Sequence, residues 1–169
     1  KKKGAGGLVE ILEDNLKDIS VVGITSHTQN FLEGIQIANI IKSFNGKIKV
    51  VMGGPHVTFL DEETLRNSSI DIVVRGEGDY IFLELCRRLA DNKGLEDVAG
   101  ISYKIDNGTI KRNLNRLPVA GDQIPSPAYH LLPDTSELTL VLETARGCPM
   151  KCVFCAESSL WQKVRYRKI

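Results

Sequence analysis

The chain has 169 residues, 42% of them hydrophobic and 25% charged, a composition typical of a globular protein with a buried core. The formal net charge of +1 gives no support for a nucleic-acid or anionic-membrane partner, and no apolar run reaches the roughly 18 residues of a transmembrane helix. The lysine-rich start has no apolar stretch behind it, so we expect no signal peptide there.

Helical and strand patterns alternate through the first half of the chain. Leucine spacing predicts an amphipathic helix over residues 7–17. Short apolar, β-branched runs typical of buried parallel strands cover residues 19–25, 47–52 and 70–74. A helical pattern follows each of these runs, over residues 31–44, 61–66 and 79–91. This order predicts an α/β fold whose parallel sheet has helices on both faces.

The apolar positions of two helices predict which of their faces point inward. In the helix over residues 31–44 the inward residues are Ile35, Ala38, Ile41 and Phe44. In the helix over residues 79–91 they are Ile81, Leu85 and Leu89, and Cys86 beside them reads as a core cysteine.

Polar or glycine-rich loops follow all three predicted strands, at residues 25–28, 53–56 and 76–78. Parallel α/β sheets bind ligands at the carboxyl ends of their strands, and glycine lets the backbone approach a ligand closely. Each loop alone is also explained as a simple turn. Three such loops at one edge predict a ligand site.

The second half of the chain reads as a hairpin, a linker and the start of another domain. Asp106-Asn107-Gly108 joins strand patterns at 98–103 and 109–112 and predicts a hairpin. A proline-rich linker then leads to a strand over residues 138–144. We therefore expect an α/β domain over 1–117, a linker over 118–136, and the start of a second domain over 137–169.

Three of the four cysteines follow that strand with the spacing C-x3-C-x2-C: Cys148, Cys152 and Cys155. Disulfide frameworks spread an even number of cysteines along the chain, whereas a close cluster can bind one metal centre. A structural zinc site or an ordinary iron–sulfur cluster takes four ligands, so three cysteines on a four-iron cluster leave one iron open. A zinc site needs another Cys or His nearby, and the nearest upstream is His130. A redox C-x-x-C pair leaves Cys148 unexplained.

This loop resembles the signature of the radical SAM superfamily, C-x3-C-x-aromatic-C, with Phe154 as the aromatic residue. The resemblance implies a [4Fe–4S] cluster on the three cysteines and S-adenosylmethionine bound to the open iron through its amino and carboxylate groups. It further implies reductive cleavage to a 5′-deoxyadenosyl radical, with backbone near Phe154 against the adenine. An electron donor such as flavodoxin or ferredoxin is the expected partner.

A second resemblance covers most of the chain. Its motifs are Val22-Gly23-Ile24-Thr25-Ser26, Met52-Gly53-Gly54-Pro55-His56, Val74-Arg75-Gly76-Glu77-Gly78-Asp79, the linker Ile124-Pro125-Ser126-Pro127-Ala128-Tyr129, and the tail from Trp161 to Arg167. They are similar to the cobalamin (B12)-binding domain that precedes many radical SAM barrels. The resemblance implies a Rossmann-like, flavodoxin-like domain followed by the first strand and cluster loop of a partial TIM-type βα barrel.

In that family the three loops line the cobalamin. The residues expected to contact it here are Thr25, Ser26, His27, Gly53, Gly54, His56, Gly76, Glu77 and Gly78. Ser26 would hydrogen-bond the nucleotide tail, and Gly53 and Gly54 would let it pass against backbone. Some relatives have a cobalt-ligating His in a D-x-H-x-x-G loop, a motif that this chain does not contain. We expect His27 and His56 to be loop hydrogen-bonders, and the basic tail over 163–168 to be a solvated surface.

The sequence thus predicts a cytoplasmic radical SAM enzyme with a cobalamin-binding domain, acting by methyl transfer or another radical modification. One alternative is a methylthiotransferase, whose N-terminal domain carries three further cysteines where this chain has Cys86. Another is a non-catalytic cobalamin- or metal-binding module. We expect the sequence to be an internal piece of a longer protein. We further expect this piece to be inactive alone, and to be less stable than the full domain because one edge of its sheet is open and apolar.

Overall fold

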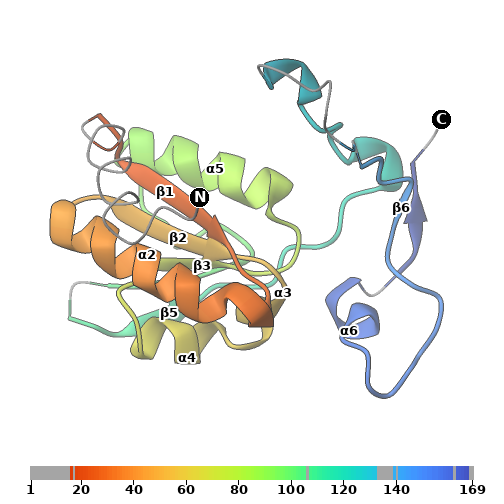
Figure 1. Ribbon diagram of the computed structural model, residues 1–169, viewed down its shortest axis with the longest axis horizontal. Helices are drawn as coiled ribbons and strands as arrows, with labels where there is room; N and C mark the ends of the chain where they lie inside the picture. Colours follow the sequence, from red (N-terminus) through yellow and green to blue (C-terminus); the bar gives the residue numbers. More distant parts are fainter. Residues whose placement is uncertain are drawn as a thin grey trace. The chain divides into compact units, whose positions relative to one another are not determined.

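The computed structural model describes residues 16, 18–105, 107–132, 139, 141–161 and 163–167. It forms two compact units, Lys1–Arg116 and Leu117–Ile169 (Figure 1). The helix predicted over residues 7–17 lies outside the described residues, apart from Leu16, which is buried. Within the described ranges, no helix has the length and apolar character that a membrane span requires.

The first unit contains a five-stranded sheet with the order β1-β2-β3-β4-β5 (Figure 1). The strands are β1 (Val21–Thr25), β2 (Lys49–Gly53), β3 (Ile72–Val74), β4 (Ile101–Lys104) and β5 (Ile110–Arg112). The first three strands pair in parallel, which confirms the Rossmann-like α/β prediction. The predicted hairpin is present as β4 and β5. It joins the same sheet, because β4 pairs antiparallel with β3, so the sheet is mixed.

Four helices connect or follow the parallel strands. They are α2 (Phe31–Phe44), α3 (Pro55–Phe59), α4 (Asp61–Arg66) and α5 (Gly78–Ala90). The bounds of α2 and α4 match their predictions. The short helix α3 was predicted as loop, but its Pro55 occupies the first helical turn, where a missing N–H costs no hydrogen bond.

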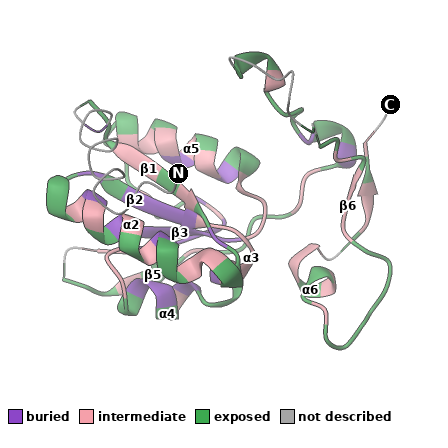
Figure 2. Cartoon of the chain, in the orientation of Figure 1, coloured by how far each residue is buried: buried purple, intermediate pink, exposed green. Residues whose placement is uncertain are grey.

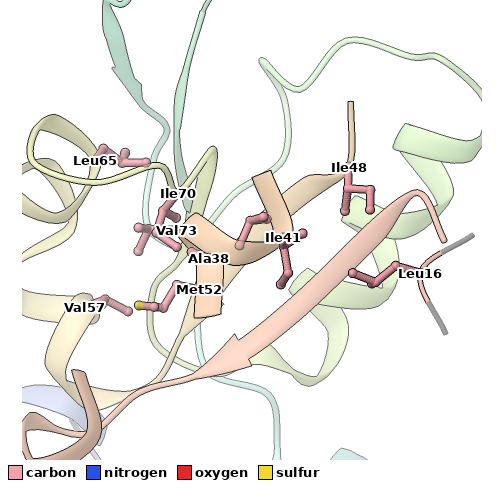
Figure 3. Packing of buried hydrophobic residues seen from close by; sticks show 10 residues of the cluster. Leu16, Ala38, Ile41, Ile48, Met52, Val57, Leu65, Ile70 and Val73 are labelled. Carbon is pink, nitrogen blue, oxygen red and sulfur yellow. The ribbon is translucent and has the colours of Figure 1, made fainter. Parts of the chain in front are cut away.

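The core lies on both faces of the sheet, as the alternation of residues along each strand requires. One cluster contains Val50, Met52 and Val73 together with residues of α2, α3 and α4, and Met52 lies beside Val57 and Ala38 (Figure 3). The other contains Val51, Ile72, Val74 and residues of α5. Figure 2 shows the buried residues concentrated along β2 and β3.

Three sequence predictions about burial need correction. Phe44 was predicted to face inward, but it is 40% exposed because α2 ends there. Cys86 is only half-buried and belongs to neither core cluster. The predicted buried strand at residues 19–25 is half-exposed as β1, which has a strand partner on one side only among the described residues.

The second unit has short elements. They are the 3-10 turns η2 (Gly121–Gln123) and η3 (Tyr129–Leu131), the helix α6 (Glu157–Trp161), and the antiparallel pair β6 (Ala145–Arg146) and β7 (Arg165–Tyr166). The strand predicted over 138–144 is wrong where the structure describes it. Residues 139 and 141–144 are not in a strand, and β6 begins at Ala145, directly after the end of the predicted strand.

Candidate cofactor sites

The first two predicted cobalamin loops are bound directly to each other at the carboxyl ends of β1 and β2. Ser26 is fully buried, and its backbone N–H donates to the Gly53 carbonyl at 2.8 Å. The His56 N–H donates in turn to the Ser26 carbonyl at 3.4 Å. The Ser26 hydroxyl donates to the His27 carbonyl at 3.3 Å. Its contact with a nucleotide tail stays a prediction.

The two adjacent glycines of the second loop have different structural roles. Gly54 has φ +106°, and a Cβ added there would lie 2.4 Å from the Ser26 carbonyl oxygen. Only glycine fits this crossing of two backbones. A Cβ added at Gly53 would make an ordinary contact, 3.7 Å from the Val74 carbonyl oxygen. The close approach of the loops therefore depends on Gly54.

Thr58 connects the second loop to the third. Its hydroxyl donates to the Gly54 carbonyl at 2.9 Å and accepts from the Gly76 N–H at 3.0 Å. Gly76 has φ +73°, and an added Cβ would meet nothing within 4 Å. The three loops thus form one hydrogen-bonded rim with open space at Gly76, where a bulky ligand can approach backbone. Thr58 was not predicted from the sequence, although its position four residues after Gly54 in a Pro-initiated turn was a usable signal.

Both histidines of the rim are engaged within the loops. His56 Nδ1 lies 3.1 Å from the Thr28 hydroxyl, and its ring lies 4.2 Å from that of Phe31. The backbone N–H of His27 donates to the side-chain oxygen of Asn30 at 2.7 Å. His56 also lines a pocket of about 230 Å³ between α2 and α4, together with residues such as Ile35.

A buried ionic cluster lies at the end of β3, directly before the third loop. Asp61 accepts from the Ser102 hydroxyl at 2.5 Å and from Arg112 Nε at 2.8 Å, and Arg75 Nε lies 3.4 Å away. Arg75 also donates to the carbonyls of Ile101 (3.1 Å) and Asn113 (2.5 Å). The cluster therefore ties α4 and the β4–β5 hairpin to the residue before Gly76.

The charges in this cluster shift two pKa values. Burial raises the pKa of Asp61, but hydrogen bonds from Ser102 and Arg112 and the two nearby guanidinium charges outweigh it, so the net shift is downward. Burial, followed by repulsion from Arg112, lowers the pKa of Arg75. Asp61 is thus held as the carboxylate and pairs with a buried guanidinium.

The cysteine loop lies in the second unit, directly after β6. Cys148 and Cys152 are exposed, Cys155 is half-buried, and none of the three is in a disulfide. The Cys155 N–H donates to the Cys152 carbonyl at 3.1 Å, which turns the loop back on itself. Phe154 is 90% exposed.

The cysteine loop offers three thiols as possible ligands of a metal centre. In the described part of the chain, no group of three or more His, Cys, Asp or Glu side chains is arranged to hold a metal ion. A four-iron cluster binds each thiolate through a different iron. Three free, accessible thiols on one loop fit that centre by their chemistry.

Comparison with known proteins shows which families the chain resembles. Residues 7–86 match the family model of the B12 binding domain. The chain is 42% identical to an uncharacterized methyltransferase of Pyrococcus horikoshii over 149 residues, 83% of this chain and 32% of that protein. It is 29% identical to the cobalamin-dependent radical SAM methyltransferase TokK of Streptomyces tokunonensis, over 87% of this chain and 23% of that protein.

A solved structure agrees with these sequence matches. The cobalamin-dependent S-adenosylmethionine radical enzyme OxsB, with aqua-cobalamin and S-adenosylmethionine bound, superimposes with a TM-score of 0.75 at 26% identity, over 96% of this chain and 23% of that chain. Residues 7–86 are therefore a B12-binding domain, and over most of its length the chain is similar to cobalamin-dependent radical SAM enzymes. It spans about a quarter to a third of the length of these relatives.

The comparisons cover the segments in which the two predicted sites lie. All predicted cobalamin contacts, from Thr25 to Gly78, fall within the matched residues 7–86. The structural match to OxsB extends over nearly the whole chain. The individual contacts of the rim and of the cysteine loop stay predictions.

Proposed function

We propose that this chain is the cofactor-holding part of a cytoplasmic radical SAM enzyme that transfers a methyl group to an unidentified substrate. The observation that carries the proposal is the rim at the carboxyl ends of β1, β2 and β3. There Gly54 and Thr58 bind three loops into one edge whose backbone is open at Gly76. This edge lies within the matched B12-binding domain.

In this proposal the rim binds cobalamin through backbone as well as side chains. The Gly54 crossing and the Thr58 bridge fix the shape of the edge, and Gly76 to Gly78 offer backbone to the ligand. Cys148, Cys152 and Cys155 hold a [4Fe–4S] cluster whose open iron takes S-adenosylmethionine. When bound, the cluster and cobalamin supply the electron and the methyl carrier, and a flavodoxin or ferredoxin is the proposed electron donor.

Methyl transfer is favoured over other radical reactions by the names of the relatives. The P. horikoshii protein and TokK are both called methyltransferases. A Rubrivivax gelatinosus relative, 28% identical over 158 residues (87% of this chain and 28% of that protein), is instead an anaerobic magnesium-protoporphyrin IX monomethyl ester cyclase. The substrate class therefore has to come from experiment.

The first experiment is a metal analysis of the full-length protein, purified without oxygen from cells supplied with cobalamin. Iron, sulfide and cobalt are assayed on the sample used for the absorbance spectrum. We expect about four irons and one cobalt per chain. Cys152→Ala serves as a matched variant that should lose iron and keep cobalt. Iron without cobalt would remove the cobalamin part of the proposal, and zinc without iron would overturn the enzyme assignment.

A further inference from the structure

Two segments of the second unit have no part in the proposed cofactor contacts: residues 119–125 of the proline-rich linker and residues 163–167 of the basic tail. The structure brings them together. Arg165 Nη1 donates to the Val119 carbonyl at 2.7 Å. Arg167 donates to the carbonyls of Ile124 and Pro125, at 2.6 and 2.9 Å. The prediction that the tail is a solvated surface is therefore wrong for these two arginines.

Between its two ends, the linker packs backbone to backbone on β7. Gly121 is buried, and a Cβ added there would lie 1.9 Å from the Tyr166 carbonyl oxygen and 2.6 Å from its carbonyl carbon. A side chain at this position is excluded unless the linker moves away. Ile124, at the end of the same turn, is 4% exposed. The linker is thus fixed at both ends by charge-assisted hydrogen bonds and in the middle by a glycine contact.

β7 in turn holds the base of the cysteine loop. It pairs with β6, and the Arg167 N–H donates to the Thr144 carbonyl at 2.9 Å. Gly147, the residue before Cys148, has φ +96°, and a Cβ there would lie 2.5 Å from the Lys163 carbonyl oxygen. The entry into the loop therefore packs on the segment that carries the two arginines.

A side-chain network supports the same base. Glu143 accepts from Arg146 Nε at 2.9 and 3.0 Å and lies 3.6 Å from Arg167 Nη2. The Arg146 guanidinium lies 5.8 Å from the centre of the Trp161 ring. Arg167, whose side chain is 14% exposed, therefore contacts both the linker and residues 143–144, which lead into the loop through β6.

We propose that residues 119–125 form a strap that positions the cluster loop, with Gly121, Arg165 and Arg167 as its positioning residues. The inference rests on the proposed function, because positioning matters only if the three cysteines hold the cluster. In this proposal residues 119–125 of the linker are a structural part of the unit that carries the cysteine loop. Arg167 is suited to this role because its planar fork reaches two neighbouring carbonyls at once, which a lysine ammonium cannot reproduce.

The test uses the full-length protein, handled without oxygen, and the variants Gly121→Ala, Arg167→Met and Arg167→Lys. Lys163→Met is the matched control, because it removes a positive charge from the same tail at an exposed residue. Hydrogen exchange is measured at the amides of residues 119–124 and 144–147. Iron and cobalt contents are measured together with the paramagnetic resonance spectrum of the reduced cluster, with and without S-adenosylmethionine.

We expect Gly121→Ala and Arg167→Met to speed exchange in both segments by at least about tenfold, which corresponds to ~1.4 kcal/mol. Iron content should fall, or the spectral change caused by S-adenosylmethionine should be lost, while cobalt content stays unchanged. Arg167→Lys should recover part of the protection, and Lys163→Met should match wild type.

The failure of this inference is distinguishable from failure of the proposed function. If wild type holds iron and cobalt and both variants keep its exchange rates and spectrum, the strap is refuted and the function stands. If wild type holds no iron, the function fails and the strap fails with it as a cluster-positioning device. Loss of cobalt by Arg167→Met would also overturn the inference, because a strap within the second unit leaves the cobalamin domain intact.

Discussion

Replacing Asp61 by Asn should destabilise the first unit substantially. The Asp61 side chain is 8% exposed and that of Arg75 is 3% exposed, so their charges neutralise each other away from water. Asparagine keeps the shape of the side chain and one acceptor oxygen for Ser102. It removes the negative charge, and Arg75 is left buried without its carboxylate partner.

The structure sets the size of the effect. Removing one partner of a buried ion pair costs ~3–5 kcal/mol, because the other charge stays uncompensated. Arg75 here keeps its bonds to the carbonyls of Ile101 and Asn113 and a bond to Asn115. We therefore expect a loss of about 2–3 kcal/mol in the free energy of unfolding, near the lower end of that range. This is a large share of the ~5–15 kcal/mol that stabilises a domain.

The assay is urea unfolding of the 169-residue chain, followed by circular dichroism and by fluorescence. Trp161 is the sequence's single tryptophan and lies in the second unit, so its fluorescence follows that unit separately. Glu62→Gln is the matched control, since it neutralises the neighbouring acid of α4 in an exposed pair with Arg66 worth ~0–0.5 kcal/mol. Equal stability of the Asp61→Asn and Glu62→Gln variants would refute the reasoning.

The same cluster predicts a pH dependence with a definite sign. The pKa of Asp61 is lowered in the folded state, so the carboxylate contributes stability above its unfolded pKa of about 3.9. That contribution is lost as the pH falls through the folded value. Asp61→Asn should therefore flatten the acid side of the stability profile, while Glu62→Gln should leave its slope close to that of wild type.

Three further changes test the rim and one thiol. Gly54→Ala puts a Cβ 2.4 Å from the Ser26 carbonyl oxygen and should weaken aqua-cobalamin binding by at least about tenfold in equilibrium dialysis, with Gly53→Ala much milder. Thr58→Val removes two hydrogen bonds at a cost of ~1–3 kcal/mol and should speed amide exchange in the third loop; unchanged exchange would contradict the bridge. Burial raises the pKa of Cys86, so stability should fall as the pH rises above about 8.5, and Cys86→Ala should reduce that alkaline slope in urea titrations.

Local sequence patterns were sufficient for the elements whose signal is periodic. The bounds of α2 match their prediction because the apolar spacing of 3.6 residues continues from Phe31 to Phe44. The strand pairing of the hairpin is not a local property. β4 pairs with β3, about thirty residues earlier in the chain, and no residue of the hairpin specifies that neighbour.

The strand predicted over 138–144 shows where a composition signal fails. The run is apolar and β-branched, yet Val141 and Leu142 are 70% and 74% exposed. Such a run forms a strand only when a partner strand offers its backbone, and in the described residues the pairing with β7 begins at Ala145. β-propensity measures the fit to a sheet, so the prediction depended on a partner that the sequence pattern does not reveal.

The candidate rim could likewise be predicted only in part. Its loops were predictable because glycines and small polar residues directly follow strands, and that relation is local. The contacts of the ionic cluster directly before the third loop are distant in sequence. Ser102 and Asp61 are 41 residues apart, and Arg112 reaches Asp61 across 51 residues. A single sequence does not show which distant residues come into contact. The sequence therefore placed Arg75 in a loop and gave no sign of its buried ion pair.

The two arginines of the tail show why charge alone is a poor guide to exposure. In the sequence, Arg165 and Arg167 belong to a basic run, which by default indicates a solvated face. Both guanidinium groups instead donate to linker carbonyls, and those acceptors carry no charge that a pattern search could match. Hydrogen bonds to backbone oxygens cannot be found by pairing opposite charges in the sequence. Gly121 was the better signal that the linker packs on the tail. Close packing of two backbones requires a glycine at the contact, whereas a flexible linker does not require one.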